Sequence, residues 1–388
     1  MSAEPTRAQA QALRRRNDAL LAAADFDLSP FTVAWEVTRA CALACVHCRA
    51  TAQPKPDPRQ LTHEEAIRVI DQVREAGNPI LIFTGGDPLM RRDVYDLMAY
   101  AVHKGLRTAL TPSATALVTP KSLARVREAG VSRIAVSLDG PTAEVHDRFR
   151  GFRGTFERTL RIMEYVREAG LTLQINTTVC RYNVTALDEM VEIVQRAGAV
   201  QWSVFFLVPT GRGRLDDMIS AEEHERVFHW LYDLSQTAPF DIKSTAAPAY
   251  RRVAIQRSRQ ERAAGGAAGR PIAGAGYRFH DGLDRPAMGV NDGRGFAFIS
   301  HIGEVCPSGF LPVAAASVRD QSFVDIYRNS ALFRDLRDPE KLKGKCGACE
   351  FRIVCGGSRA RAWAVTGDYL ESDPSCVYVP QTVAAARV

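Results

Sequence analysis

The 388-residue sequence predicts an α/β fold: a partial, TIM-like (β/α)6 barrel followed by a small, cysteine-rich C-terminal domain. Two observations support this prediction. From residue 31 to about 245, short runs of apolar and β-branched residues alternate with helical stretches at the spacing of β/α units. After a segment rich in Gly, Ala and Arg, four of the nine cysteines lie between Cys346 and Cys376.

The composition is that of a globular protein. Hydrophobic residues make up 46% and charged residues 24% of the sequence, which argues against a largely disordered chain. The net charge of +6 is spread along the chain rather than gathered in one basic stripe, so nucleic acid is not an expected partner. The sequence has no apolar run of about 18 residues, and its N-terminus lacks the apolar stretch of a signal peptide. We therefore expect a cytoplasmic protein without a membrane partner.

The predicted strands follow one another in the order 31–37, 80–84, 106–111, 132–138, 171–179 and 200–208, with a further candidate at 240–245. Helical stretches separate them. One stretch has clear limits, because Thr62 and Glu65 have the spacing of a capping box and Gly77 lies just past its end. In a parallel sheet or barrel, the loops at the carboxyl ends of the strands carry the chemistry, so we expect functional motifs there.

The sequence divides into four predicted parts: an N-terminal helical extension over 1–30, the barrel over 31–256, a flexible linker over 257–290 and the cysteine-rich domain over 291–388. The linker is rich in Gly, Ala and Arg and shows little periodicity. In the last part we expect a hairpin over 296–307 that turns at 301–303, and helices over 322–329 and 331–337.

Cys41, Cys45 and Cys48 follow the first predicted strand in the pattern C-x3-C-x2-C. In a reducing compartment, clustered cysteines indicate a metal site rather than disulfides. A cubane [4Fe-4S] cluster has four irons, so three thiolates leave one iron without a protein ligand, and a substrate can bind there. A structural zinc site is the alternative; it requires a fourth ligand, for which His47 is the near candidate.

This spacing, at the exit of the first strand of a β/α domain, resembles that of the radical S-adenosylmethionine (SAM) superfamily. The resemblance implies that Cys41, Cys45 and Cys48 hold a [4Fe-4S] cluster whose open iron binds SAM. It also implies reductive cleavage of SAM to a 5′-deoxyadenosyl radical, which takes a hydrogen atom from an unactivated carbon. His47 stands where the family usually has an aromatic residue beside the adenine, so we expect it to contact SAM.

Gly85, Gly86 and Asp87 follow the second strand and resemble the family's Gly-Gly-Glu-Pro turn, whose backbone and acid meet the SAM ammonium group. Two glycines let the chain approach a ligand closely, and a carboxylate pairs with an amine. The side chain of Asp87 is one methylene shorter than the family's glutamate, so its direct contact is the weaker prediction. An ordinary glycine-rich turn is the alternative interpretation.

Two later strand ends resemble other SAM-binding segments of the family. Ser137 and Arg150 match a serine and an arginine that hold the SAM ribose and carboxylate, although a surface ion pair is an alternative role for the arginine. Leu207 matches the apolar contact of an adenine-reading segment, with a plain strand core as the alternative. The third strand ends with Thr111-Pro112-Ser113, where relatives commonly have Thr-Asn-Gly, so we assign no contact to that loop.

The C-terminal cysteines resemble the SPASM extension of radical SAM peptide-modifying enzymes, which in full form holds two auxiliary clusters with seven cysteines. Arg359 and Ser308 occupy two of the expected cysteine positions, and a third cysteine is missing between residues 270 and 300. The resemblance therefore implies one auxiliary [4Fe-4S] cluster, with four ligands: Cys346, Cys349, Cys355 and Cys376. Structural zinc is the alternative. We expect Cys180 and Cys306 not to be ligands.

The resemblance implies an oxidoreductase or maturase-type radical SAM enzyme of the SPASM/twitch group. That group includes peptide maturases and the radical SAM enzymes of alternative heme and heme d1 biosynthesis, so we expect a peptide or tetrapyrrole-like substrate and an electron donor such as flavodoxin or ferredoxin. A non-catalytic iron–sulfur or zinc protein on a degenerate barrel is the alternative, to which Asp87 and Pro112 point. Asn291, Asp292 and His301 are weaker candidates for lining the pocket.

Overall fold

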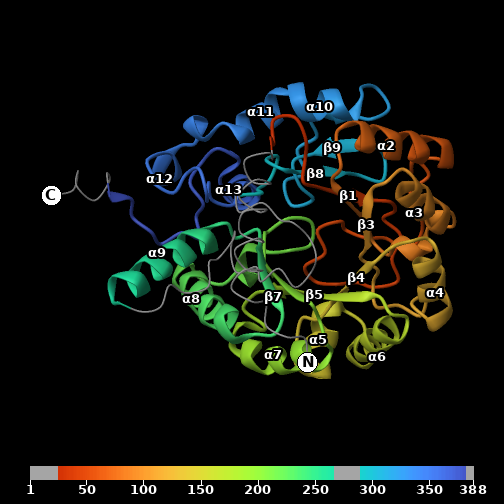
Figure 1. Ribbon diagram of the computed structural model, residues 1–388, viewed down its shortest axis with the longest axis horizontal. Helices are drawn as coiled ribbons and strands as arrows, with labels where there is room; N and C mark the ends of the chain where they lie inside the picture. The colour runs from red at the N-terminus through yellow and green to blue at the C-terminus, as the bar shows by residue number, and fades with distance from the viewer. Residues whose placement is uncertain (1–24, 266–288, 382–388) are drawn as a thin grey trace.

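The computed structural model describes residues 25–265 and 289–381. Of the predicted N-terminal extension, only residues 25–30 are described, and they form a turn. Residues 266–288 of the predicted linker lie outside the described residues. Figure 1 shows a curved sheet with helices around its outer side, and the C-terminal segment beside the first strands.

One ten-stranded sheet runs through the molecule in the order β10-β9-β8-β1-β2-β3-β4-β5-β6-β7. Its parallel part consists of β1 (Thr32–Glu36), β2 (Ile80–Thr84), β3 (Arg107–Leu110), β4 (Arg133–Ser137), β5 (Thr172–Val179), β6 (Gln201–Phe206) and β7 (Asp241–Thr245). Each strand lies within a predicted one. The predicted parallel α/β fold is confirmed, and the further candidate at 240–245 is a strand.

Helices connect the parallel strands and cover the outer face of the sheet: α2 (His63–Glu75), α3 (Val94–His103), α4 (Pro120–Glu128), α5 (Ala143–Arg150), α6 (Thr155–Glu168), α7 (Leu187–Arg196), α8 (Ala221–Thr237) and α9 (Ala249–Ala263). The predicted capping box is confirmed: the Glu65 amide donates to Thr62 Oγ1 at 3.2 Å and the Thr62 amide donates to Glu65 Oε2 at 2.8 Å. Within the described residues, no helix is long and apolar enough to span a membrane.

Helix α9 continues to Ala263, so residues 257–263 are helical rather than part of a flexible linker. The reason is packing against α8. Arg257 forms an ion pair with Asp233 at 2.6 Å, and Tyr232 donates a hydrogen bond to Glu261 at 2.7 Å. The linker was predicted from composition, and composition does not show contacts between two helices.

The alternation of β5 shows where the core lies. Leu173, Ile175 and Val179 are buried and belong to the apolar core formed with the outer helices. Gln174 and Asn176 lie on the opposite, inner face and are partly exposed. The strand register continues the inner row of Asn176 through neighbouring strands, where it consists of Ser137, Asn176, Ser203 and Lys243. The inner face of the barrel is therefore polar along this row.

The C-terminal segment extends the barrel sheet. Strand β8 (Phe296–Ile299) pairs in parallel with β1, and β9 (Glu304–Cys306) returns antiparallel to β8, which confirms the predicted hairpin. Strand β10 (Ala316–Ser317) and the short helices α10 (Phe323–Asn329), α11 (Ala331–Arg337), α12 (Gly344–Gly347) and α13 (Arg359–Thr366) follow. Strands β8 to β10 follow the predicted boundary near residue 290 in the sequence, but they belong to the same sheet as the barrel strands.

Candidate functional site

The loop after β1 brings three thiols together. Cys41 and Cys45 are buried and Cys48 is half-buried, and the three pack in one cluster with Leu43. The Leu43 amide donates to Cys41 Sγ at 3.4 Å. Burial raises the pKa of the Cys41 and Cys45 thiols, so a metal must displace their protons in order to bind.

Arg150, at the end of α5, lies beside these thiols. Its guanidinium donates to Cys45 Sγ at 3.8 Å and forms a close ion pair with the buried carboxylate of Asp139. The Thr178 amide donates to the other oxygen of Asp139 at 2.7 Å. Arg150 is thus held at the thiols by strands β4 and β5, within the region where the sequence predicts the SAM carboxylate.

The glycine pair after β2 packs against the cysteine loop. The Gly86 amide donates to the Thr38 carbonyl at 2.8 Å, and a Cβ atom on Gly86 would lie 2.4 Å from the Ala40 carbonyl oxygen. Gly85 is equally close to Thr38, at 2.3 Å from its carbonyl oxygen. Close approach to a ligand was the predicted reason for these glycines, whereas in the structure they make room for the main chain that leads into Cys41.

Asp87 is fully buried, and its carboxylate accepts hydrogen bonds from Thr115 Oγ1 at 2.6 Å and from the Leu89 amide at 3.2 Å. Burial raises the pKa of this carboxyl group. Ser113 lies in the same region, because its hydroxyl donates to the Gly86 carbonyl at 2.7 Å and lies 3.5 Å from Cys41 Sγ. The loop after β3, to which the sequence assigned no contact, therefore supplies two polar groups beside the site.

His47 and Leu207 converge on Phe149. The rings of His47 and Phe149 stack with centroids 4.2 Å apart and planes inclined by 20°, and Leu207 packs with Phe149 and Cys180. Burial, with the positive charges of Arg150 and others nearby, lowers the pKa of His47 well below its ordinary value. Its Nδ1 atom is buried without a hydrogen-bond partner among the described residues. A neutral ring and an apolar wall therefore lie next to the thiols.

The loop after β6 holds the cysteine loop from the other side. Arg212 Nε donates to the Cys45 carbonyl at 2.9 Å, and its main-chain amide donates to the Cys48 carbonyl at 3.0 Å. Gly211 has φ +62°, and a Cβ atom there would lie 2.5 Å from the Cys48 carbonyl oxygen. Arg212, Ser113, Thr115 and Phe149 were not predicted as site residues. Nothing in the local sequence signals their contacts, which join distant loops.

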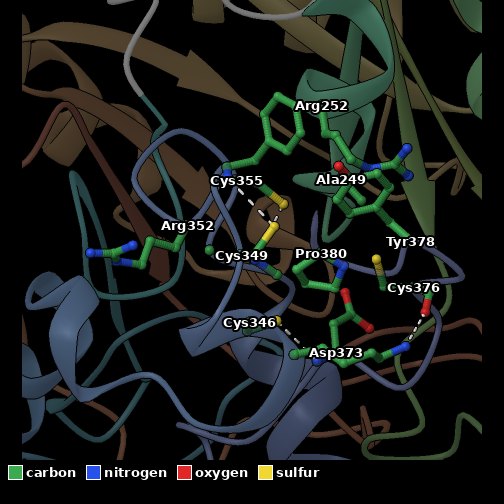
Figure 2. Close-up of a pocket in the computed structure, with 14 residues that line it drawn as sticks. Ala249, Arg252, Cys346, Cys349, Arg352, Cys355, Asp373, Cys376, Tyr378 and Pro380 are labelled. Carbon is green, nitrogen blue, oxygen red and sulfur yellow. Dashed lines mark hydrogen bonds between the residues drawn. The ribbon is translucent and has the colours of Figure 1, made fainter. Parts of the chain in front are cut away.

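The C-terminal thiols line one cavity. The four are Cys346, Cys349, Cys355 and Cys376, and Figure 2 shows their sulfur atoms around a common space. Main-chain amides donate to three of them at 3.4 Å: Phe351 to Cys349, Gly357 to Cys355 and Asp373 to Cys346. Burial raises the pKa of Cys355 to about 12. A metal must therefore displace the proton of Cys355 in order to bind it.

Three residues were not predicted to be ligands of the auxiliary cluster: Cys180, Cys306 and Ser308. Within the described residues, neither Cys180 nor Cys306 lines the cavity, and burial raises the pKa of each to about 12. Ser308 accepts hydrogen bonds at 3.2 Å from the amides of the turn that follows it. In the part of the chain that the structure describes, no group of three or more His, Cys, Asp or Glu side chains is arranged to hold a single metal ion.

The three polar residues considered as pocket candidates instead hold the C-terminal segment in place. Asn291 Nδ2 donates to the Gly357 carbonyl at 2.8 Å, and Asp292 accepts from the Ala360 amide at 2.9 Å. His301 is buried between two carboxylates, 2.9 Å from Glu36 Oε1 and 3.2 Å from Asp57 Oδ2. The last residue ties the β8–β9 turn to β1 and to the segment after the cysteine loop.

A parallel α/β barrel with three clustered thiols after its first strand defines a class, and comparison with known proteins names it. Residues 35–197 match the model of the Radical SAM superfamily. The chain is 45% identical to the AdoMet-dependent heme synthase of Oleidesulfovibrio alaskensis over 91% of this chain and 89% of that protein. It is 45% identical to the enzyme of the same name from Methanosarcina barkeri, over 91% of this chain and 97% of that one. The chain belongs to the radical SAM superfamily and is an enzyme.

More distant relatives include the mycofactocin maturase MftC of Mycolicibacterium smegmatis, 30% identical over 90% of this chain and 83% of that protein. Among solved structures, that of Streptococcus suis SuiB bound to S-adenosylmethionine superposes with a TM-score of 0.69 at 15% identity, over 94% of this chain and 81% of that one. This likeness shows the fold. Membership of an enzyme superfamily argues against the alternative of a non-catalytic protein on a degenerate barrel.

Proposed function

We propose that this enzyme takes part in heme synthesis and modifies the side chains of an iron tetrapyrrole by SAM-dependent radical chemistry. One observation carries the proposal: identity is 45% to proteins named AdoMet-dependent heme synthase, but 28% to an Fe-coproporphyrin III synthase and 30% to a mycofactocin maturase, each over 90% or more of this chain.

Cys41, Cys45 and Cys48 would hold the [4Fe-4S] cluster. Three soft thiol donors gathered in one buried loop suit iron–sulfur ligation and leave one corner open. When bound there, the cluster and SAM supply a 5′-deoxyadenosyl radical that takes a hydrogen atom from the substrate. A low-potential protein such as flavodoxin or ferredoxin would provide the electron.

Residues around the thiols would position SAM. Arg150 holds a guanidinium 3.8 Å from Cys45 Sγ, and this cation can pair with a ligand carboxylate beside the thiols. The stacked pair of His47 and Phe149, with Leu207, provides a flat, uncharged surface for an adenine ring. The roles of Gly85, Gly86, Asp87 and Ser137 stay predictions. Asp87 would have to leave Thr115 to bind an ammonium group directly.

The proposed reaction is the oxidative loss of CO2 from a propionate side chain of the tetrapyrrole. Conversion of a propionate side chain to a vinyl group removes a hydrogen atom, CO2 and one electron from the substrate. Its radical must therefore be oxidised once after the hydrogen atom has left, and a cluster on the C-terminal thiols would accept that electron. The polar inner row of Ser137, Asn176, Ser203 and Lys243 would face a substrate in the barrel, and a lysine suits propionate carboxylates.

The four C-terminal thiols would hold one auxiliary [4Fe-4S] cluster in a domain that begins near residue 291. Four thiols around one cavity, with amide donors to three of the sulfur atoms, support this assignment. Zinc remains the alternative metal. Iron, sulfide and zinc analysis of anaerobically purified protein distinguishes them.

The function is tested with anaerobically reconstituted enzyme, SAM, dithionite and iron coproporphyrin III. We expect 5′-deoxyadenosine together with porphyrin products that have lost CO2, detected by mass spectrometry, and neither product from a Cys45→Ala variant. Formation of 5′-deoxyadenosine without any change in the porphyrin would contradict the proposed substrate. The proposed cleavage of SAM would still be supported.

Peptide modification is a second candidate, supported by the 30% identity to a mycofactocin maturase over 90% of this chain. It predicts that a small peptide, and not a porphyrin, raises the yield of 5′-deoxyadenosine above the uncoupled level. Parallel assays with both substrate classes therefore decide between the two candidates.

A further inference from the structure

Arg359 lies where the SPASM pattern would have a cysteine of a second cluster, and it contacts the retained cysteine site. Its side chain is 1% exposed. Nη2 donates to Cys346 Sγ at 3.5 Å, Nη1 donates to the carbonyls of Tyr369 at 3.0 Å and Glu371 at 2.7 Å, and Nε donates to the Gly357 carbonyl at 3.2 Å. The guanidinium is thus held at a thiol by three main-chain carbonyls.

The neighbouring chain is shaped to admit this contact. Gly357 has φ +66°, and a Cβ atom there would lie 2.4 Å from Arg359 Nη2 and 2.9 Å from Cys346 Sγ. Any larger residue would therefore separate the guanidinium from the sulfur. The Asp373 amide donates to the same sulfur at 3.4 Å, so Cys346 receives two N–H donors.

The charge of Arg359 is balanced differently from that of the arginines around it. Three neighbours each bind a carboxylate: Arg252 binds Glu225 at 2.8 Å, Arg361 binds Asp373 at 3.4 Å and Arg352 binds Glu340 at 2.7 Å. The hydrogen-bond partners of Arg359 among the described residues are the three carbonyls and the thiol, and none is a carboxylate. A buried cation is costly without an anionic partner. The buried carboxylates of Asp292 and Asp373 act on Arg359 through space without bonding to it, and the side chain that receives its hydrogen bond is Cys346.

We propose that Arg359 is a positioning residue for the auxiliary cluster: it fixes the Cys346 thiolate and raises the reduction potential of the cluster. The inference rests on the proposed binding of a cluster by the four C-terminal thiols. Reduction adds a negative charge to a cluster, and a nearby cation with an N–H···S hydrogen bond stabilises that charge. Replacement of the guanidinium by a neutral group therefore lowers the potential.

The test isolates the auxiliary cluster in the full chain by the substitutions Cys41→Ala, Cys45→Ala and Cys48→Ala. In that background, Arg359→Gln is compared with Arg359→Lys and with Arg352→Gln in redox titrations followed by electron paramagnetic resonance (EPR). We expect Arg359→Gln to lower the equilibrium constant for reduction at least tenfold, which is about 59 mV for one electron. Arg359→Lys keeps the charge and should shift it less.

Arg352→Gln is the matched control, because Arg352 lines the same cavity but points away from the sulfur atoms and pairs with Glu340 (Figure 2). It should leave the potential unchanged. If Arg359→Gln titrates like Arg352→Gln, the inference is overturned. If the triple-alanine background holds no iron and sulfide, the proposed cluster fails instead, so the two failures are distinguishable.

A second measurement covers the case in which Arg359→Gln does not retain its cluster. The triple-alanine protein is labelled with arginine that carries 15N in the guanidinium group alone, and the reduced cluster is examined by pulsed EPR. We expect a resolved coupling to an arginine nitrogen that disappears in Arg359→Lys. The absence of any 15N coupling in the labelled protein would contradict the proposed N–H···S bond.

Discussion

The two cysteine sites are built in different ways. The thiols of Cys41, Cys45 and Cys48 lie in one loop that is held by loops from four other strands, through contacts that include Gly86, Ser113, Arg150 and Arg212. The C-terminal thiols lie within residues 346–376 and receive their amide donors from the same segment. The first site is therefore a product of the barrel, whereas the second is largely self-contained.

This difference matches the number of thiols. A site with three thiols, with neighbours such as Arg150 and His47 from other parts of the barrel, needs the barrel to supply the rest of its surroundings. A site with four thiols can complete a cluster from its own segment, with Arg252 among the charged residues that line the cavity and Arg359 in contact with Cys346. Perturbation of the barrel loops should therefore affect the first site and spare the second.

The largest expected effect comes from the thiols themselves. Cys45→Ala should abolish 5′-deoxyadenosine formation and lose roughly half of the bound iron, because each cubane holds four irons. Cys355→Ala is the matched change in the other site and should remove a similar share of iron while SAM is still cleaved. Iron analysis and chromatography of the products check both. Equal loss of SAM cleavage in the two variants would break the comparison.

Gly86→Ala should have the next largest effect. A Cβ atom would lie 2.4 Å from the Ala40 carbonyl oxygen, so the cysteine loop must move; a shift of about 1 Å in an active site can cost on the order of 10²-fold in rate. Gly105→Ala is a control for loss of stability alone: its φ of +81° strains a side chain, but the added Cβ atom meets nothing within 4 Å. SAM cleavage should fall in the first variant only, with the C-terminal iron retained in both.

Arg212→Ala should weaken the first site more moderately. It removes the hydrogen bond to the Cys45 carbonyl at 2.9 Å and one to the Ala52 carbonyl at 3.3 Å, which should cost about 1–3 kcal/mol in the free energy of unfolding. Denaturant titration measures that loss, and the EPR signals of the two clusters show where it falls. Loss of the C-terminal signal first would be the opposite of the expected result.

The last effect concerns the pH dependence of stability. Burial, with the charge of Arg150, lowers the pKa of His146 from 6.5 to about 3 in the folded chain, and its Nδ1 accepts a hydrogen bond from the Asp139 amide at 3.1 Å. Above pH 6.5 neither state binds the proton. Below it the unfolded chain is protonated first, so the free energy of unfolding should fall by about 1.4 kcal/mol per pH unit down to the folded pKa.

His146→Gln removes this titration and should flatten the dependence between about pH 6.5 and pH 5. Unfolding curves for both proteins over that interval make the comparison. Parallel pH dependences in the wild-type protein and the variant would show that His146 does not carry the effect.

Much of the fold followed from local patterns. The parallel strands, the capping box at Thr62 and the hairpin after residue 296 depend on alternation, spacing and turn residues, all of which are visible in the sequence. The pairing of β8 with β1 was not predictable in this way, because it joins segments more than 250 residues apart, such as Thr32 and Phe296. The helical start of the expected linker depends on ion pairs with α8, which composition does not show.

In the candidate site too, features within a short segment of sequence were predictable, and contacts between distant segments were not. The cysteine spacings could be recognised because each set lies within a short segment. Ser113, Thr115 and Arg212 could not, since each acts through contacts with residues in other loops. The packing of the glycine pair against the main chain was not predicted, and its predicted approach to a ligand stays a prediction. Gly86 is needed where two main chains meet, and only the packed structure reveals the second one.

The most direct test of the account is the EPR spectrum of the reduced, full-length enzyme with and without SAM. The account predicts two [4Fe-4S] signals, of which one changes when SAM is added and is absent after Cys41→Ala, Cys45→Ala and Cys48→Ala. The other should be unaffected by SAM and disappear only when the C-terminal thiols are replaced. A SAM-dependent change that survives the three N-terminal substitutions would contradict the central claim.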